Sequence, residues 1–216
     1  MAIAYIGSQH GVATSTGFDT TSANLLLAVV VGDGGYTFSD NKGNTWTALT
    51  ERIGAAGQRI RFHYCVGTIN TGSGHTITST VGYHRVILGA FSGVDAIGGE
   101  TWTDDGGFSL EAINAGSLTP SSDGALLVGV CAYGNTTSAF AMDGTTGYTL
   151  AQSQTGVSGT SYGGGYAYKI QGTAAAINPE FQWTGSVRTS AAHVWFSAAA
   201  GGGSSNGAAR HYYAQL

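Results

Sequence analysis

The first residue of this chain that could do chemistry is a serine in a nucleophile-like motif. The stretch GTSYG, residues 159–163, fits the G-x-S-x-G pattern that surrounds the nucleophile of α/β-hydrolases. That chemistry requires a strand before the serine and a helix after it. Ser161 is instead followed by YGGGYAYKI, a glycine-rich hinge and an alternating, strand-like run. We therefore expect no nucleophile here, and we assign no catalytic residue.

The acidic residues could catalyse glycoside hydrolysis only as a pair, because that reaction needs two carboxyl groups that face each other across a cleft. No two glutamates share a strand at alternate positions; they are Glu51, Glu100, Glu111 and Glu180. Asp104 and Asp105 stand between Trp102 and a Gly-Gly pair, where they could help to hold Ca²⁺ or cap a turn. Two adjacent acids are far from a full coordination sphere, so we favour the turn and expect no cofactor.

Metal ligands are also too few. His63 and Cys65 are two positions apart, which places them on one face of a strand. Zinc takes three or four protein ligands, and we find no further ligands for it. Cys65 and Cys131 form no CxxC motif, and the N-terminus has neither the basic start nor the sustained apolar core of an export signal. We expect two free, buried thiols, no metal and synthesis in a cytoplasm.

Two tryptophans could stack against a sugar ring. In SDNKGNTWTAL, residues 39–49, Trp46 follows a glycine-bearing turn and alternates with threonines, a pattern found on sugar-binding surfaces and in sandwich cores. Trp102 precedes Thr103 and two aspartates, which makes it the best candidate for a glycan site on a loop. The choice between core and ligand depends on the elements that carry these rings.

Those elements are predicted to be β-strands. In QRIRFHYCVG, residues 58–67, one face of an alternating run carries Ile60, Phe62, Tyr64 and Val66. Turn signals such as GDGG, DNKGN, NTGSG and MDGTTG separate the runs at short intervals. Glycine makes up 36 of the 216 residues, and no long stretch shows capped helical periodicity. The chain is therefore expected to be all-β.

The two halves of the chain resemble one another in four blocks. SANLLLAVVVG from Ser22 resembles SDGALLVGVCA from Ser122, and DNKGNTWTAL resembles DGTTGYTLAQ. RFHYCVGT and HRVILGAFSG likewise resemble GYAYKIQGT and AHVWFSAAAG. Because the blocks recur in the same order, the sequence predicts the duplication of a unit of about 100 residues. Trp46 then corresponds to Tyr148, and an aromatic residue at both positions favours a core role for Trp46.

Two strands, at residues 25–31 and 125–131, are apolar on both faces and need cover on both sides. We expect an opposing sheet on one side and loops or a neighbouring subunit on the other. The sequence predicts a two-sheet antiparallel sandwich of jelly-roll type. It would form a single domain over residues 1–200, with repeats at about 20–97 and 120–200. A tandem of two small sandwiches, divided near residues 98–106, is the alternative.

Composition argues against several classes of protein. The net charge is −4 with 8 basic residues, whereas nucleic-acid binding relies on clustered lysine and arginine. Charged residues make up 9% and hydrophobic residues 42%, the reverse of a disordered chain. No apolar run approaches the ~20 residues that span a bilayer. We therefore expect neither nucleic-acid nor membrane binding.

The C-terminal segment, residues 201–216, has a composition of its own. A Gly/Ser/Asn linker precedes a short stretch rich in apolar and aromatic surface, with His211, Tyr212, Tyr213 and Leu216. Tyrosine is enriched at interfaces because its ring buries area while its hydroxyl finds a partner. The tail is predicted to dock on another subunit, and the alternative is that it folds back on its own domain.

These motifs resemble a recurrent β-sandwich module of bacteriophage virion proteins and related phage-like bacterial sequences. The resemblance rests on the turn at residues 40–47, on the aromatic strand with Phe62 and Tyr64, and on FSGVD at residues 91–95. SLTPSSDGALLVGV, residues 117–130, is similar to the second half of that module. The resemblance spans most of residues 20–200. It implies a jelly-roll-like fold and a virion setting, with no catalytic residues to carry over.

Together these features predict a non-enzymatic structural component of a phage virion, either a head decoration or a tail or fibre appendage. It would bury surface against other virion proteins, as a homo-oligomer, after synthesis in the host cytoplasm. The alternative is a carbohydrate- or receptor-binding adhesin of the virion or cell surface, with a host-surface glycan bound at Trp102, Asp104 and Asp105. An enzyme acting on polysaccharide is the least favoured interpretation, because paired carboxylates are not visible.

Overall fold

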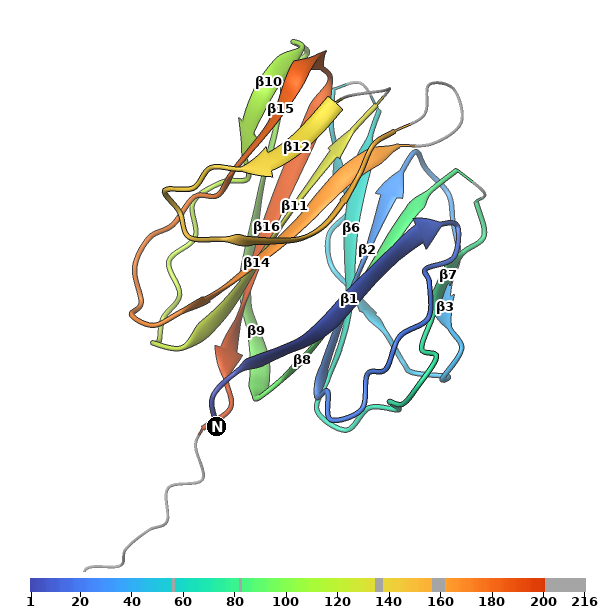
Figure 1. Ribbon diagram of the computed structural model, residues 1–216, viewed down its shortest axis with the longest axis vertical. Coiled ribbons are helices and arrows are strands. Elements are labelled where there is room, and N and C mark those ends of the chain that lie inside the picture. Colours follow the sequence, from blue (N-terminus) through green and yellow to red (C-terminus); the bar gives the residue numbers. More distant parts are fainter. Residues whose placement is uncertain (56, 82, 135–137, 157–161, 201–216) are drawn as a thin grey trace, which may run out of the picture.

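The computed structural model describes residues 1–200 with the exception of residues 56, 82, 135–137 and 157–161 (Figure 1). Two sequence predictions lie outside the described residues. One concerns Ser161 of the nucleophile-like motif. The other concerns the tail and its partner-binding side chains, His211, Tyr212, Tyr213 and Leu216. Docking of the tail on another subunit therefore stays a prediction.

All regular secondary structure of the described residues is β-strand, so the prediction of an all-β chain is confirmed. Gly163, the last residue of the G-x-S-x-G motif, begins strand β14 (Gly163–Gln171), whereas a hydrolase nucleophile would need a helix at this place. None of the described segments forms a helix that could cross a membrane. Cys65 and Cys131 are free and buried, as predicted.

Two large antiparallel sheets form the middle of the molecule (Figure 1). The first has the order β1 (Ala4–Val12), β8 (Arg85–Ser92), β2 (Leu25–Gly32), β6 (Arg59–Val66), β4 (Thr47–Ala48), and β5 (Arg52–Ile53) also pairs with β6. The second has the order β9 (Val94–Asp104), β16 (Thr189–Ala198), β11 (Ala125–Tyr133), β14, β13 (Thr149–Gln154). The strands β2 and β11 are therefore central in their sheets.

Two smaller antiparallel sheets lie on the outside. One pairs β3 (Phe38–Asp40) with β7 (Ile77–Ser79), and the other has the order β10 (Leu110–Asn114), β15 (Glu180–Val187), β12 (Ser138–Met142). Figure 1 shows the sheets as successive layers, with β3 and β7 at the right and the β10–β15–β12 sheet at the upper left.

The central core lies between the two large sheets. Alternate residues of β2 and β11 supply its middle: Leu25, Leu27, Val29, Val31, Leu126, Val128, Val130 and Ala132. β6 contributes to the same core the alternating set that the sequence predicted: Ile60, Phe62, Tyr64 and Val66. Burying such side chains contributes roughly 1.5–3 kcal/mol each, so this core is the main support of the fold.

The other faces of β2 and β11 are covered by the same chain. Leu26 of β2 packs in one outer core with Ile77 of β7, and Leu127 of β11 packs in the other with Phe181 of β15. Every residue of β2 and β11 is buried. The sequence interpretation was right that both faces need cover. The cover comes from the small sheets together with loop residues such as Tyr36 and Ile69, so the expectation of loops is confirmed in part, and the chain buries these faces without a neighbouring subunit.

Candidate functional site

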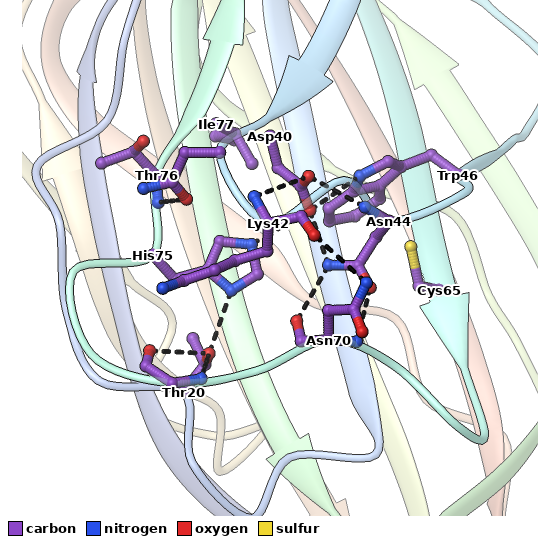
Figure 2. A network of polar contacts seen from close by, with 12 residues as sticks. Thr20, Asp40, Lys42, Asn44, Trp46, Cys65, Asn70, His75, Thr76 and Ile77 are labelled. Carbon is purple, nitrogen blue, oxygen red and sulfur yellow. Dashed lines mark hydrogen bonds and ion pairs between the residues drawn. The ribbon is translucent and has the colours of Figure 1, made fainter.

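The turn that leads to Trp46 is organised by the side chain of Asp40, the last residue of β3 (Figure 2). Asp40 Oδ1 accepts hydrogen bonds from the backbone N–H groups of Lys42 at 3.2 Å and Asn44 at 3.0 Å. Aspartate commonly stabilises turns in this way. Gly43 has a φ of +71°, a conformation that favours glycine, and it lets the chain reverse. The sequence motif around Asp40 is thus a folding signal.

The second carboxylate oxygen of Asp40 contacts three side chains. Asp40 Oδ2 accepts hydrogen bonds from Asn44 Nδ2 at 2.7 Å and from Trp46 Nε1 at 3.2 Å. It also lies 3.1 Å from His75 Nε2. The side chains of Asp40 and His75 are both 0% exposed. Hydrogen-bond donors therefore surround a carboxylate that has no contact with solvent, which is how a buried charge is tolerated.

Burial and hydrogen bonding together set the charge of the Asp40–His75 pair. Burial raises the pKa of Asp40, but the hydrogen bonds from Asn44 and His75 outweigh it and bring the pKa below its usual value. Burial lowers the pKa of His75, and the hydrogen bond to Asp40 offsets only part of that effect. At neutral pH the pair is an ionised carboxylate beside a neutral imidazole, and the hydrogen bond assigns the imidazole proton to Nε2.

His75 connects Asp40 to Thr20. His75 Nδ1 lies 3.0 Å from Thr20 Oγ1, and because Nε2 donates to Asp40, the hydroxyl donates to Nδ1. A hydroxyl, an imidazole and a carboxylate in series are the parts of a nucleophile triad. In such a triad Nε2 faces the hydroxyl, whereas here Nε2 faces the carboxylate. Thr20 and His75 are both fully buried. The hydroxyl, the imidazole and the carboxylate are therefore closed to substrate. Together with Asn44 and Trp46, these three groups form the Asp40 cluster.

Sequence reasoning missed the pairing of Asp40 with His75. The two residues lie 35 positions apart, and no motif spacing connects them. The pair depends on the pairing of β3 with β7, in which Asp40 is the partner of Ile77, and the sequence carries no signal for that register. That pairing brings His75 beside the turn that Asp40 organises, as Figure 2 shows.

An open depression of about 410 Å³ lies beside the Asp40 cluster. Its lining includes one cationic side chain and four rings: Arg61, Tyr36, Phe38, Trp46 and His63. Phe38 stacks on His63 with the ring centroids 4.2 Å apart and meets Trp46 edge to face at 5.0 Å. The hydroxyl of Tyr36 lies 3.0 Å from His63 Nε2. The volume is within the usual range for small-ligand sites, and the rings hold one another in place.

Trp46 belongs partly to the core and partly to this surface. Its ring packs against the outer core that contains Leu26, as the core interpretation predicted. It is nevertheless only half-buried, and it lines the depression. Tyr148 is the residue that corresponds to Trp46 in the second half of the chain. It is 8% exposed, and its hydroxyl lies 2.6 Å from His193 Nε2. The core prediction is confirmed for Tyr148 and holds only in part for Trp46.

Trp102, the ring predicted to meet a glycan on a loop, lies instead on strand β9, where it is half-buried against the central core. The guanidinium carbon of Arg52 lies 5.8 Å from the centre of its ring. Arg52 in turn donates a hydrogen bond to Glu100 at 2.9 Å, which ties β5 of the first large sheet to β9 of the second. Much of the Trp102 surface is thus engaged by the protein itself.

Asp104 and Asp105 form the bonds that turn capping predicts. Asp104 Oδ1 accepts a hydrogen bond from the backbone N–H of Gly106 at 2.9 Å. Asp105 accepts hydrogen bonds from the backbone N–H groups of Gly107 and Thr189, each at 2.8 Å. These carboxylates therefore stabilise the end of β9, and their role in ligand binding stays a prediction.

Groups of three or more His, Cys, Asp or Glu side chains that could hold a metal ion do not occur among the described residues. Comparisons of the chain with protein-family models, with curated proteins and with solved structures give no match.

Proposed function

We propose that this chain is a non-enzymatic structural component of a phage particle, a head decoration or a tail or fibre appendage. The observation that carries the proposal is the burial of the carboxylate and the imidazole of the Asp40 cluster. The turn on which the resemblance to virion modules rests uses the Asp40 carboxylate for internal hydrogen bonds, both within the turn and with the imidazole of His75. With those groups committed to the fold, the chain would act through its surface, by burying area against other virion proteins and against copies of itself.

The finer architecture that we propose is a jelly-roll-type sandwich built from a duplicated unit of about 100 residues. The strand order of the two large sheets supports this architecture, because β1-β8-β2-β6-β4 in the first sheet corresponds strand by strand to β9-β16-β11-β14-β13 in the second. The four similar sequence blocks fall on corresponding strands: β2 and β11, β4 and β13, β6 and β14, β8 and β16. The core shared by both large sheets favours one domain over a tandem of two.

Sedimentation of lysate from cells that produce the protein tests this proposal. We expect the chain to migrate with particles of viral mass and to stay with them after a salt wash. Recovery only as a free, small oligomer would contradict a structural role. A variant that ends at residue 200 serves as the matched control, since it should unfold at the same temperature as the full chain yet assemble more weakly. Unchanged assembly of that variant would contradict docking by the tail.

A second function, recognition of a host-surface glycan, is favoured by the aromatic-lined depression beside Trp46. Trp102 is covered in part by Arg52, and Asp104 is engaged with the backbone. The depression is therefore the better candidate for a sugar than the Trp102 site at the end of β9. Both functions can reside in one protein, because a particle subunit can also carry a receptor site.

A further inference from the structure

The depression beside Trp46 combines an aromatic lining with a single cation, and this combination selects a class of ligand. We propose that it binds a saccharide that carries a carboxylate, with Trp46 against the apolar face of the sugar ring and Arg61 on the carboxylate. The inference deepens the second proposed function and rests on it. It is independent of whether the chain assembles into a particle.

Trp46 is held in place before any ligand arrives. Its Nε1–H donates to the buried carboxylate of Asp40, and Phe38 meets it edge to face. Phe38 is itself stacked on the buried ring of His63. A ring fixed by such contacts loses little conformational freedom when a ligand packs on it, which lowers the cost of binding. The Asp40 cluster thus acts as the support of the site.

Arg61 offers the charge that a carboxylate would need. Its Nε donates to the backbone oxygen of Leu49 at 3.2 Å, which anchors the side chain. Within the described part of the chain, its two terminal nitrogens have no hydrogen-bond partner. Those nitrogens can donate to both oxygens of a carboxylate, the strongest geometry for this pair. His63 does not share this role, because burial and the charge of Arg61 lower its pKa to about 4.

The acids near the depression do not compete for Arg61. Asp40 is surrounded by donors, and its side chain is fully buried. Glu51, whose charge acts on Tyr36, forms an ion pair with Arg59. The guanidinium of Arg61 is therefore left for an acidic group that comes from solution.

A saccharide fits this site better than a nucleic acid. One cation and a chain of net charge −4 do not match a polyanion, which needs clustered basic residues. A pyranose has an apolar face that can pack on the indole of Trp46. Its hydroxyls can form direct or water-mediated hydrogen bonds at the solvent-exposed edge of the depression, where Ser39 lies.

NMR titration of the whole protein with methyl β-D-glucuronide tests the proposal, and methyl β-D-glucoside is the neutral matched probe. We expect the glucuronide to shift the indole N–H resonance of Trp46, with a Kd on the order of 1 mM. The resonance of Trp183, which is buried on β15 in the outer core that contains Phe181, should stay unchanged. The glucoside should bind about tenfold more weakly, because it lacks the charge-assisted hydrogen bonds. No shift at Trp46 with either sugar would overturn the site, and equal affinities would overturn the carboxylate specificity.

Variants separate the two contacts. Arg61→Gln should reduce affinity for the glucuronide about tenfold and leave affinity for the glucoside unchanged, because only the charged contact is lost. Arg188→Gln, a matched arginine change on the second half of the chain, should alter neither. Trp46→Phe should keep part of the binding of both sugars, whereas Trp46→Ala should abolish it in a chain that still unfolds cooperatively. Binding lost in Trp102→Phe but kept in Trp46→Ala would overturn the assignment.

Discussion

In the first outer sheet Asp40 is paired with Ile77, and in the second Met142 is paired with Phe181. Asp40 and Met142 each end a short strand, and each is followed by a turn that leads to an edge strand of a large sheet. The first turn closes around a buried carboxylate. The second packs Met142 in an apolar outer core and leaves Asp143 to cap the turn at the surface.

The difference shows that equivalent turns of the two outer sheets can be stabilised either by a buried carboxylate or by apolar packing. Loss of one partner of an apolar contact leaves a cavity, whereas loss of one donor leaves a buried charge without compensation. The polar turn also leaves Trp46 half-exposed above a depression, while the apolar turn buries Tyr148. The polar version therefore supports a surface feature, and the apolar version serves the core.

Removal of the charged group should separate the two turns most strongly. Asp40→Ala leaves several buried donors without an acceptor, and we expect it to lower the free energy of unfolding by about 3–5 kcal/mol. Asp143→Ala removes only a surface cap and should leave the unfolding midpoint close to that of the parent chain. Urea unfolding of both variants measures the difference. Similar losses in the two variants would show that the first turn is not organised by its carboxylate.

Acid should destabilise both halves through buried histidines. His63 and His193 have pKa values lowered by burial from 6.5 to about 4. The unfolded chain takes up a proton on each near the usual value, and the folded chain does so only at lower pH. Stability should therefore fall as the pH drops through this window, by about 3 kcal/mol for each histidine.

Urea unfolding at a series of pH values checks this slope. His193→Gln should lower stability at neutral pH but flatten the decline toward acid, because one of the two titrating groups is gone. A parent chain whose stability is level or rises on acidification would be inconsistent with neutral buried imidazoles.

A double substitution can sharpen the comparison by making the first turn resemble the second. Asp40→Met and His75→Leu each leave the other member of the pair buried without its hydrogen-bond partner. The double variant removes both members at once. We expect the double variant to cost less than the sum of the single variants by about 1–3 kcal/mol. A double-mutant cycle in urea measures this coupling. Additive costs would mean that Asp40 and His75 do not act as a pair.

The features that could be predicted from the sequence are those with a local period. Alternation along β6 assigned Phe62 to the core, and the apolar runs of β2 and β11 showed that both faces are covered. The Asp40–His75 pair was beyond reach because it depends on how β3 pairs with β7. The depression was missed for a similar reason, since its rings come from the loop before β3, from β3 itself, from the turn and from β6.

The central claim is that the Asp40 cluster supports the fold and is not a reaction centre, and NMR titration of Asp40 and His75 tests it most directly. The account predicts that the Asp40 carboxyl stays ionised to a pH below its usual 3.8. It also predicts that His75 stays neutral, with its proton on Nε2, to a pH below 6.5. A His75 that takes up a proton at or above 6.5 would be an accessible base tuned to neutral pH. That result would contradict the account and return catalysis to consideration.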